Sequence, residues 1–250
     1  MLEHKKIQNL SDYFVKLDNR RERGVYFYRI NGYSEEVGAF IKKYYDAARK
    51  TGVVIEGKIP NPDEGNLSYY NEIMGMDFQM NPGFILTSLK KWLPRMNDLQ
   101  RQNVAESVYD SLDSMRKAGK TENMLKNAYI KFMCWLYYKF ERIVNQLGEN
   151  NIPKILYEGN ISSYELMLIS ILSNAGCDVV FLQYEGDSGY LKSDPGSVLS
   201  DSLQMNGLGA FPQGYCIKKV RDEIQNEINN ERLYGTRPTI TNCTNAWISG

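Results

Sequence analysis

The sequence predicts an α/β fold, with Rossmann-like β-α-β units, one or more parallel sheets and a helical insertion between the units. Residues 24–59 and 153–184 each read as strand, turn, helix and strand, and an acidic, turn-rich loop follows each unit. Residues 98–148 carry long apolar stripes at helical spacing and no strand pattern. Identity between the two units is slight, so their similarity is one of architecture.

The first unit opens with the strand pattern GVYFYRI at residues 24–30, which is rich in β-branched and aromatic side chains. Ser34 follows a turn and is a candidate N-cap, because two glutamates come directly after it, where the helix dipole favours negative charge. Gly52 ends this helix, and VVIEGKI at residues 53–59 is the next strand. Residues 60–66 then form a loop dense in helix breakers.

The second unit repeats this plan with the strands KILYE at residues 154–158 and DVVFLQY at residues 178–184. Ser162 and Glu165 match the S-x-x-E capping box at the start of the helix between them, and Gly176 stops that helix. The helix is apolar nearly all round, so we expect it to be buried on most faces.

The region between the units predicts two long helices, at about residues 98–120 and 122–148. The second helix is rich in aromatic residues, which form either a stacking surface for a base or sugar or part of the core. Core packing is the ordinary role of such a stripe, so we expect Trp135 and Phe140 to be buried.

The C-terminal part contains a polar, loop-like stretch at residues 200–211, an amphipathic helix at about 215–235 and a strand-like run at 239–247. Because the chain stops directly after that run, we expect a fragment of a longer protein. The units form either two lobes that face each other across a ligand or one merged sheet. We therefore expect four segments: a polar lead-in at 1–23, a first Rossmann-like unit at 24–85, helices at 86–150, and a second unit at 151–250, truncated at its C-terminus.

Composition argues against several classes of protein. Lys plus Arg and Asp plus Glu number 30 each, so the basic excess typical of nucleic-acid binding is missing, and we expect no nucleic-acid partner. The four cysteines form no CxxC pair and His4 is the only histidine, which disfavours a zinc site. The first residues do not resemble a signal peptide, and the longest apolar run is too short to span a bilayer. We expect a cytoplasmic protein with reduced thiols and no membrane contact.

Common catalytic and phosphate motifs are missing from the sequence. It contains no G-x-x-x-x-G-K-[ST], no G-x-G-x-x-G in either β-α turn and no G-x-S-x-G. With one histidine, a Ser-His-Asp or Cys-His mechanism has no credible base. Acid and base chemistry would fall to Asp, Glu, Lys or Tyr, and no catalytic residue is assigned.

Candidate binding residues follow the strands, because parallel sheets gather ligand groups at their carboxyl ends. The turn before the second helix could hold a phosphate at the helix N-terminus, or Ser162 could simply cap that helix. Asp187 and Asp194 could bind a hard cation such as Mg²⁺, or they could be solvated loop acids. The candidate ligand-binding residues are Gly159, Asn160, Ser162, Ser163, Lys58, Asp63, Asp187 and Asp194.

Four long runs carry a resemblance to a known family: FYRINGYSEE, GKIPNPDEGN, QRQNVAESVYDSLDSMRKAGKTENMLKNAYIKFMCWLYYKFE and PKILYEGNISSYELMLISILSNAGCDVVFLQYEGD. Together they resemble the bacterial YceG-like family, which is described as a component of a "biosynthetic module" encoded beside tellurite-resistance and stress-response (Ter) genes. The resemblance implies a contribution to making a nucleoside-like or sugar-linked metabolite, and it supplies no catalytic residues. Family members are longer than this chain, which agrees with the expected fragment.

Two functions fit these observations. The first is a subunit of stress-linked metabolite synthesis that binds a phosphorylated sugar or nucleotide at residues 159–163, and if it is an enzyme we expect a transferase. The second is a non-catalytic scaffold that docks other proteins of a Ter-type pathway through its aromatic helices. The two strand-turn-helix sites favour the first function, and the scarcity of catalytic motifs favours the second.

Overall fold

The computed structural model describes residues 2–61, 67–148 and 152–234. Its five strands are all parallel and form a single sheet in the order β2-β3-β4-β1-β5, which confirms the predicted α/β class. The sequence alone does not decide between one merged sheet and two separate sheets. In the structure, strands of both β-α-β units lie in this one sheet. The strands are β1 (Phe27–Ile30), β2 (Val53–Glu56), β3 (Lys154–Glu158), β4 (Asp178–Leu182) and β5 (Asp201–Ser202).

The two units are interleaved in the sheet. Strand β1 pairs with β4, and β2 pairs with β3. The connection from β1 to β2 therefore passes over β4 and β3. In the second unit, β3 and β4 are direct neighbours joined by α7 (Ser163–Ala175). The central strands β1 and β4 are buried along their whole length, whereas the edge strand β2 ends in the exposed Glu56. Burial on both faces is typical of the interior of a parallel sheet.

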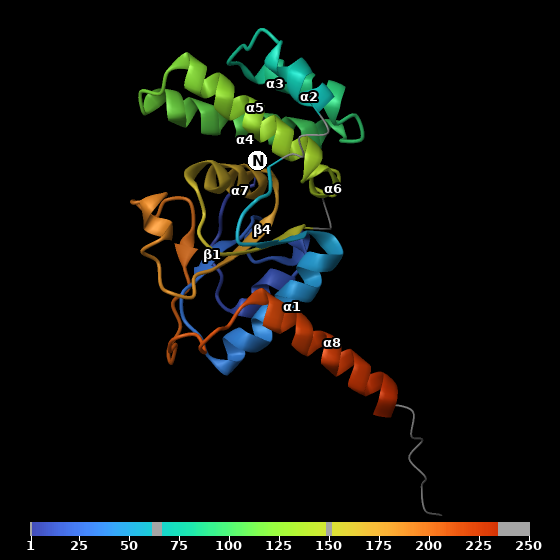
Figure 1. The fold of residues 1–250 in the computed structure, drawn as a ribbon, viewed down its shortest axis with the longest axis vertical. Coiled ribbons are helices and arrows are strands. Elements are labelled where there is room, and N and C mark those ends of the chain that lie inside the picture. The colour runs from blue at the N-terminus through green and yellow to red at the C-terminus, as the bar shows by residue number, and fades with distance from the viewer. Residues whose placement is uncertain (1, 62–66, 149–151, 235–250) are drawn as a thin grey trace, which may run out of the picture.

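Side chains alternate between two cores on opposite faces of the sheet. Tyr28 and Val180 belong to the core beneath α1 (Glu35–Thr51), while Phe27 and Val179 belong to the core beneath α7. Figure 1 shows α1 and α8 (Ile217–Tyr234) on one side of the sheet and α7 on the other, between the sheet and the helical insertion.

The local signals for both crossover helices are confirmed. Ser34 caps α1 by accepting a hydrogen bond from the Val37 amide at 3.2 Å. Gly52 ends α1 where the chain passes very close to β3, because a Cβ there would lie 1.8 Å from the Lys154 carbonyl oxygen. At the start of α7, Ser162 and Glu165 form the expected capping box. The two caps are short-range patterns, whereas the glycine at position 52 is also required by the close approach of β3.

The helical insertion is longer than its sequence pattern suggests. Helices begin at Leu67 rather than near residue 86, and the expected helix to residue 148 breaks at Phe140, whose amide donates to the Trp135 carbonyl at 3.1 Å. Trp135 is 1% exposed and Phe140 is 2% exposed, which confirms that the aromatic stripe is core. The helices are α2 (Leu67–Met74), α3 (Pro82–Trp92), α4 (Asp98–Lys117), α5 (Glu122–Tyr138) and α6 (Glu141–Val144).

The N-terminal segment packs on the amino-terminal half of the sheet and includes the short 3-10 helices η1 (Leu10–Phe14) and η2 (Leu17–Asn19). The Tyr13 hydroxyl donates to the Val179 carbonyl at 3.0 Å. Arg20 and Lys154 both pair with the fully buried carboxylate of Asp178. The polar lead-in is thus anchored to the sheet by charge as well as by apolar contact.

Part of the loop expected at residues 200–211 forms strand β5. The sequence does not reveal this strand, because two residues are too few to show a strand pattern. Cys134, Cys177 and Cys216 are unbridged, while Cys243 and the strand-like run at 239–247 lie outside the described residues. Within the ranges that the structure covers, none of the helices combines the length and the apolar character needed to span a membrane.

Candidate functional site

The carboxyl ends of all five strands lie at one edge of the sheet, where fold rules place ligands. At this edge β4 and β1 are neighbours whose following connections leave in opposite directions. Strand β1 leads to α1 on one face, and β4 leads to a loop containing η3 (Tyr190–Lys192), which joins the core of the other face. This change of direction is the switch point at which open α/β sheets commonly bind ligands.

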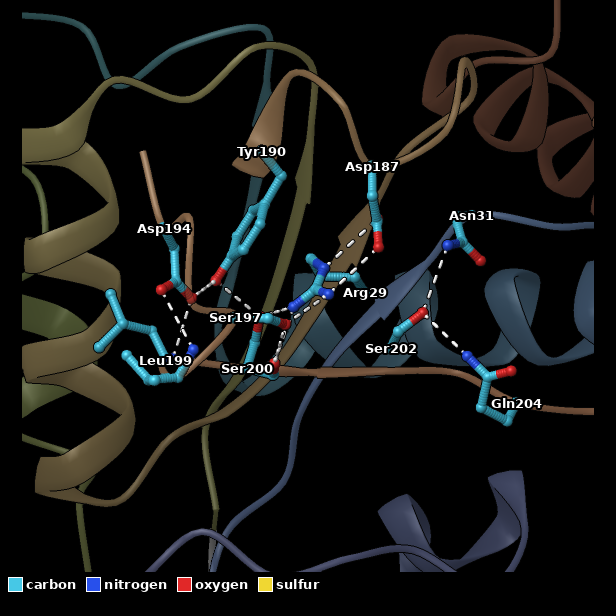
Figure 2. Close-up of polar contacts among 11 residues, drawn as sticks. Arg29, Asn31, Asp187, Tyr190, Asp194, Ser197, Leu199, Ser200, Ser202 and Gln204 are labelled. Carbon is cyan, nitrogen blue, oxygen red and sulfur yellow. Dashed lines mark hydrogen bonds and ion pairs between the residues drawn. The ribbon is translucent and has the colours of Figure 1, made fainter. Parts of the chain in front are cut away.

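Arg29 fills the switch point in this protein (Figure 2). The side chain is 2% exposed, and Nε and Nη2 donate to the two Asp187 carboxylate oxygens at 3.3 and 3.1 Å. Nη1 donates to the Ser200 carbonyl and hydroxyl oxygens, both at 2.7 Å, and Nη2 also donates to Ser197 Oγ at 2.8 Å. A guanidinium has five N–H groups, so the protein itself uses every donor of Arg29.

The loop that Arg29 holds is built around two further buried groups. The Arg29 guanidinium carbon lies 4.3 Å from the centre of the Tyr190 ring, and burial raises the pKa of the Tyr190 hydroxyl to about 12. Asp194 is 4% exposed and accepts hydrogen bonds from the Tyr190 hydroxyl and from the amides of Val198 and Leu199. These contacts make residues 187–200 a polar cover over β1, in place of a helix.

Ser197 carries the backbone strain of this cover. Its φ of 49° is a left-handed conformation, and among the described non-glycine residues it is the only positive φ. The Ser197 hydroxyl accepts from Arg29 and donates to the Ser200 carbonyl at 3.4 Å. The strained turn is therefore stabilised by the same arginine that it surrounds.

These contacts do not bring Asp187 and Asp194 together on one cation. The carboxylate of Asp187 pairs with Arg29, whereas that of Asp194 accepts from a hydroxyl and two amides. Across the described ranges, no group of three or more His, Cys, Asp or Glu side chains is placed to hold a metal ion. The expected Mg²⁺ site gains no support from this geometry, because neither aspartate has an uncommitted carboxylate directed at the other.

The turn from β3 into α7 holds the other predicted residues. Gly159 has φ +107°, and a Cβ there would lie 2.9 Å from the Gly57 Cα, so the turn needs a glycine. Asn160 lies beside the cover, because a Cβ on Gly189 would be 3.2 Å from the Asn160 Oδ1. Ser163 is the first residue of α7 and is exposed. The turn thus contacts the cover but leaves its helix N-terminus accessible.

Glu165 already places a negative charge at the N-terminus of α7. One of its carboxylate oxygens accepts from the Ser162 amide at 2.9 Å, and the other accepts from the Ile59 amide at 2.7 Å and from the Tyr157 hydroxyl at 3.4 Å. The capping box therefore also ties the segment after β2 to the turn after β3. A bound anion would share the positive end of the helix with this carboxylate.

A cavity of about 170 Å³ opens at the carboxyl ends of β2 and β3. Of the predicted residues, Lys58 and Ser162 both line it, while Asp63 lies outside the described residues. The helical insertion supplies part of the opposite wall. The lining residues are Lys58, Ile59, Asn61, Lys131, Trp135, Ser162 and Glu165.

Lys131 and Asn61 line the cavity, and the sequence analysis identified neither as a site residue; Lys131 is the one that carries charge. Its ammonium lies 4.7 Å from the centre of the Trp135 ring and 5.1 Å from that of Tyr164, so two aromatic faces hold the charge. Among the described residues no carboxylate lies within ion-pair distance of Lys131 or of Lys58. The four-residue spacing of Lys131 and Trp135 on one helix face is the signal that could have found it.

A second cavity, of about 360 Å³, lies beside β5, the edge strand on the other side of the sheet from β2. Its lining mixes apolar side chains with Lys6 and two acidic residues, Glu36 and Asp201. Because the acidic charges outnumber the basic one, this cavity is less suited to an anion than the one that Lys58 and Lys131 line.

Comparison with known proteins supports the family and not the chemistry. The YceG domain family matches residues 8–224, which is most of the chain. No curated protein and no solved structure matches the sequence. On the extent of that match, the chain belongs to the YceG domain family.

Proposed function

We propose that this YceG-domain protein is a cytoplasmic component of a bacterial biosynthetic module linked to stress and tellurite resistance, and that it binds a phosphorylated sugar or nucleotide. One observation carries the binding proposal: Lys58 and Lys131 line a single cavity at the sheet edge, and neither has a carboxylate partner among the described residues. The stress and tellurite link comes from the family resemblance.

The charge in the cavity suits a phosphate group. A phosphomonoester carries about −1.5 to −2 charges at neutral pH, and two ammonium groups match that charge. Lysine binds phosphate as a point charge and does not require the planar geometry of an arginine fork. The exposed N-terminus of α7 adds backbone N–H groups, although Glu165 offsets part of their attraction.

The same contacts support binding more than catalysis. Glu165 is the acid that lines the cavity, and both of its oxygens accept hydrogen bonds from the protein. We therefore assign no residue around the cavity as a nucleophile or a base. A transferase remains the reaction class that we would test first, because the proposed ligands are phosphorylated donors or acceptors.

A non-catalytic scaffold is the second candidate function. The aromatic residues of α5 that suggested a docking surface are largely buried, as Phe132 and Trp135 show. However, Tyr70 and Met74 lie one turn apart on α2 and are 41% and 40% exposed. If this face docks a pathway protein, the double change Tyr70→Ser and Met74→Ser should abolish co-purification of co-expressed Ter-pathway proteins without changing phosphate binding.

Calorimetric titration with inorganic phosphate at fixed ionic strength tests the binding proposal. The wild-type protein should bind, and Lys131→Met should weaken binding about tenfold or more, because a hydrogen bond to a charged group contributes about 1.5–3 kcal/mol. Lys58→Met should act in the same direction. Lys120→Met is the matched control, since Lys120 is exposed and lies away from the cavity. Equal affinities for all four proteins would contradict the proposal.

A further inference from the structure

We infer that the ligand of the Lys58–Lys131 cavity is the phosphomonoester of a small polyol or sugar, of up to about five carbons, and not a nucleotide. This inference rests on the proposed function and narrows it. It depends on three properties of the cavity: its volume, the use of its aromatic faces, and the polar groups beside its two ammonium groups.

The volume admits a phosphate and a short carbon chain. The cavity has a volume of about 170 Å³. Pockets for drug-sized ligands occupy about 300–1,000 Å³, and a nucleotide falls within that size class. A nucleotide would therefore leave its base and part of its ribose outside this cavity.

The aromatic side chains around the cavity are already in use. Lys131 covers the Trp135 ring, and the indole Nε1 donates to the Pro60 carbonyl at 3.3 Å. Tyr164 contacts the same ammonium and packs against Phe132. Recognition of a base by stacking needs a free aromatic face. These rings instead fix the position of a cation, which is the requirement of a phosphate site.

Small polar groups remain for sugar hydroxyls. The Asn61 side chain lines the cavity and makes no hydrogen bond with any described residue. The Ser162 hydroxyl accepts from the Glu165 amide at 3.4 Å, and its own proton has no acceptor among the described residues. An amide and a hydroxyl can each bond a polyol oxygen. We therefore assign the phosphate to the two lysines and the hydroxyls to Asn61 and Ser162.

A ligand series tests this assignment by calorimetry under one buffer condition. The probes are inorganic phosphate, glycerol 3-phosphate, ribose 5-phosphate, AMP and UDP-glucose. The two small phosphomonoesters should bind about tenfold more tightly than inorganic phosphate, because they add hydrogen bonds to the same anion site. AMP and UDP-glucose should bind no more tightly than inorganic phosphate.

The variant Asn61→Leu separates the hydroxyl contacts from the phosphate contact. It should remove most of the tenfold advantage of ribose 5-phosphate and leave the affinity for inorganic phosphate unchanged. Asn226→Leu, an exposed change on α8, should alter neither affinity.

The outcomes distinguish this inference from the proposed function. Tighter binding of AMP or UDP-glucose than of ribose 5-phosphate, lost in Lys131→Met, would overturn the inference and leave the proposed function standing. Equal affinities for inorganic phosphate and ribose 5-phosphate would do the same. If no phosphate compound binds, the proposed function fails and the inference fails with it.

Discussion

Arg29 and Lys131 are two cations near the same edge of one sheet, and they differ in how they are paired. Arg29 is almost fully buried and donates all of its hydrogen bonds to the protein. Lys131 is half-buried, and aromatic rings hold it where it borders a cavity, with no carboxylate partner among the described residues. A cation whose donors are all used stabilises the fold, whereas one that is positioned but unpaired can bind an anion.

The chemistry of the two side chains agrees with this division. A guanidinium is a planar fork that suits fixed acceptors, such as Asp187 and the Ser200 carbonyl. An ammonium is a compact charge on a flexible stem, and it can follow a ligand that enters and leaves. The switch point between β4 and β1, where fold rules alone would place the ligand, is therefore closed by Arg29.

The two segments that cover this face of the sheet differ in the interactions that hold them. Over β3 and β4 the cover is α7, whose buried face is apolar and includes Leu168 and Leu172. Over β1 the cover is the loop at residues 187–200, which is held mainly by charge and hydrogen bonds. We expect the loop cover to be sensitive to loss of a single charge, and the α7 side to be less so.

The largest expected effect is the loss of the carboxylate that pairs with Arg29. Asp187→Ala leaves the buried guanidinium without its counter-ion, which costs about 3–5 kcal/mol of unfolding free energy. Urea unfolding measures the loss, and Glu185→Ala, an exposed change in the same loop, should stay within about 0.5 kcal/mol. A cost for Asp187→Ala as small as that of the control would show that the loop is not held by this pair.

The loop cover should also weaken in alkali. Burial raises the Tyr190 pKa from 10.0 to about 12, so the unfolded chain loses this proton at a lower pH than the folded protein. The stabilisation is complete below pH 10 and is lost as the pH rises from about 10 to 12, a change on the order of 2 kcal/mol. The unfolding free energy of the wild type should fall more steeply over that range than that of Tyr190→Phe, and parallel curves would contradict the assignment.

A smaller effect is expected from Glu165→Gln, and it should change stability and binding in opposite directions. The variant keeps one acceptor for either the Ser162 amide or the Ile59 amide, but it loses the second acceptor and the charge, so about 1–2 kcal/mol of stability is lost. Removing a carboxylate a few ångströms from a bound phosphate lowers repulsion by about 1 kcal/mol, or about fivefold in affinity. Thermal unfolding and phosphate titration measure the two changes. Unchanged phosphate affinity would place the anion away from the N-terminus of α7.

The sequence predicts the local features of this fold well. The caps at Ser34 and Ser162, the glycine stop at Gly52 and the burial of Trp135 are all confirmed, because each leaves a short local pattern in the sequence. The strand order depends on pairing between distant segments, such as β1 with β4, which no local pattern specifies.

Some residues of the candidate site can be predicted from the sequence, and others cannot. Lys58 and Ser162 are found from their positions after strands, and the structure brings both to one cavity. Lys131 comes from a helix in the insertion, so its arrival at the sheet edge depends on tertiary packing that periodicity does not reveal. Asp187 is visible as a loop acid, but its pairing with the buried Arg29 requires the order of the strands.

A crystal structure with bound tungstate, a heavy analogue of phosphate, tests the contrast between the two cations most directly. The anomalous signal of tungsten locates the anion without reference to any proposed ligand. We predict a peak between the ammonium groups of Lys58 and Lys131, with Asp187 still paired to Arg29. A peak at Arg29 with Asp187 displaced, or no peak beside the two lysines, would contradict the assignment of Arg29 to the fold and of the lysines to the ligand.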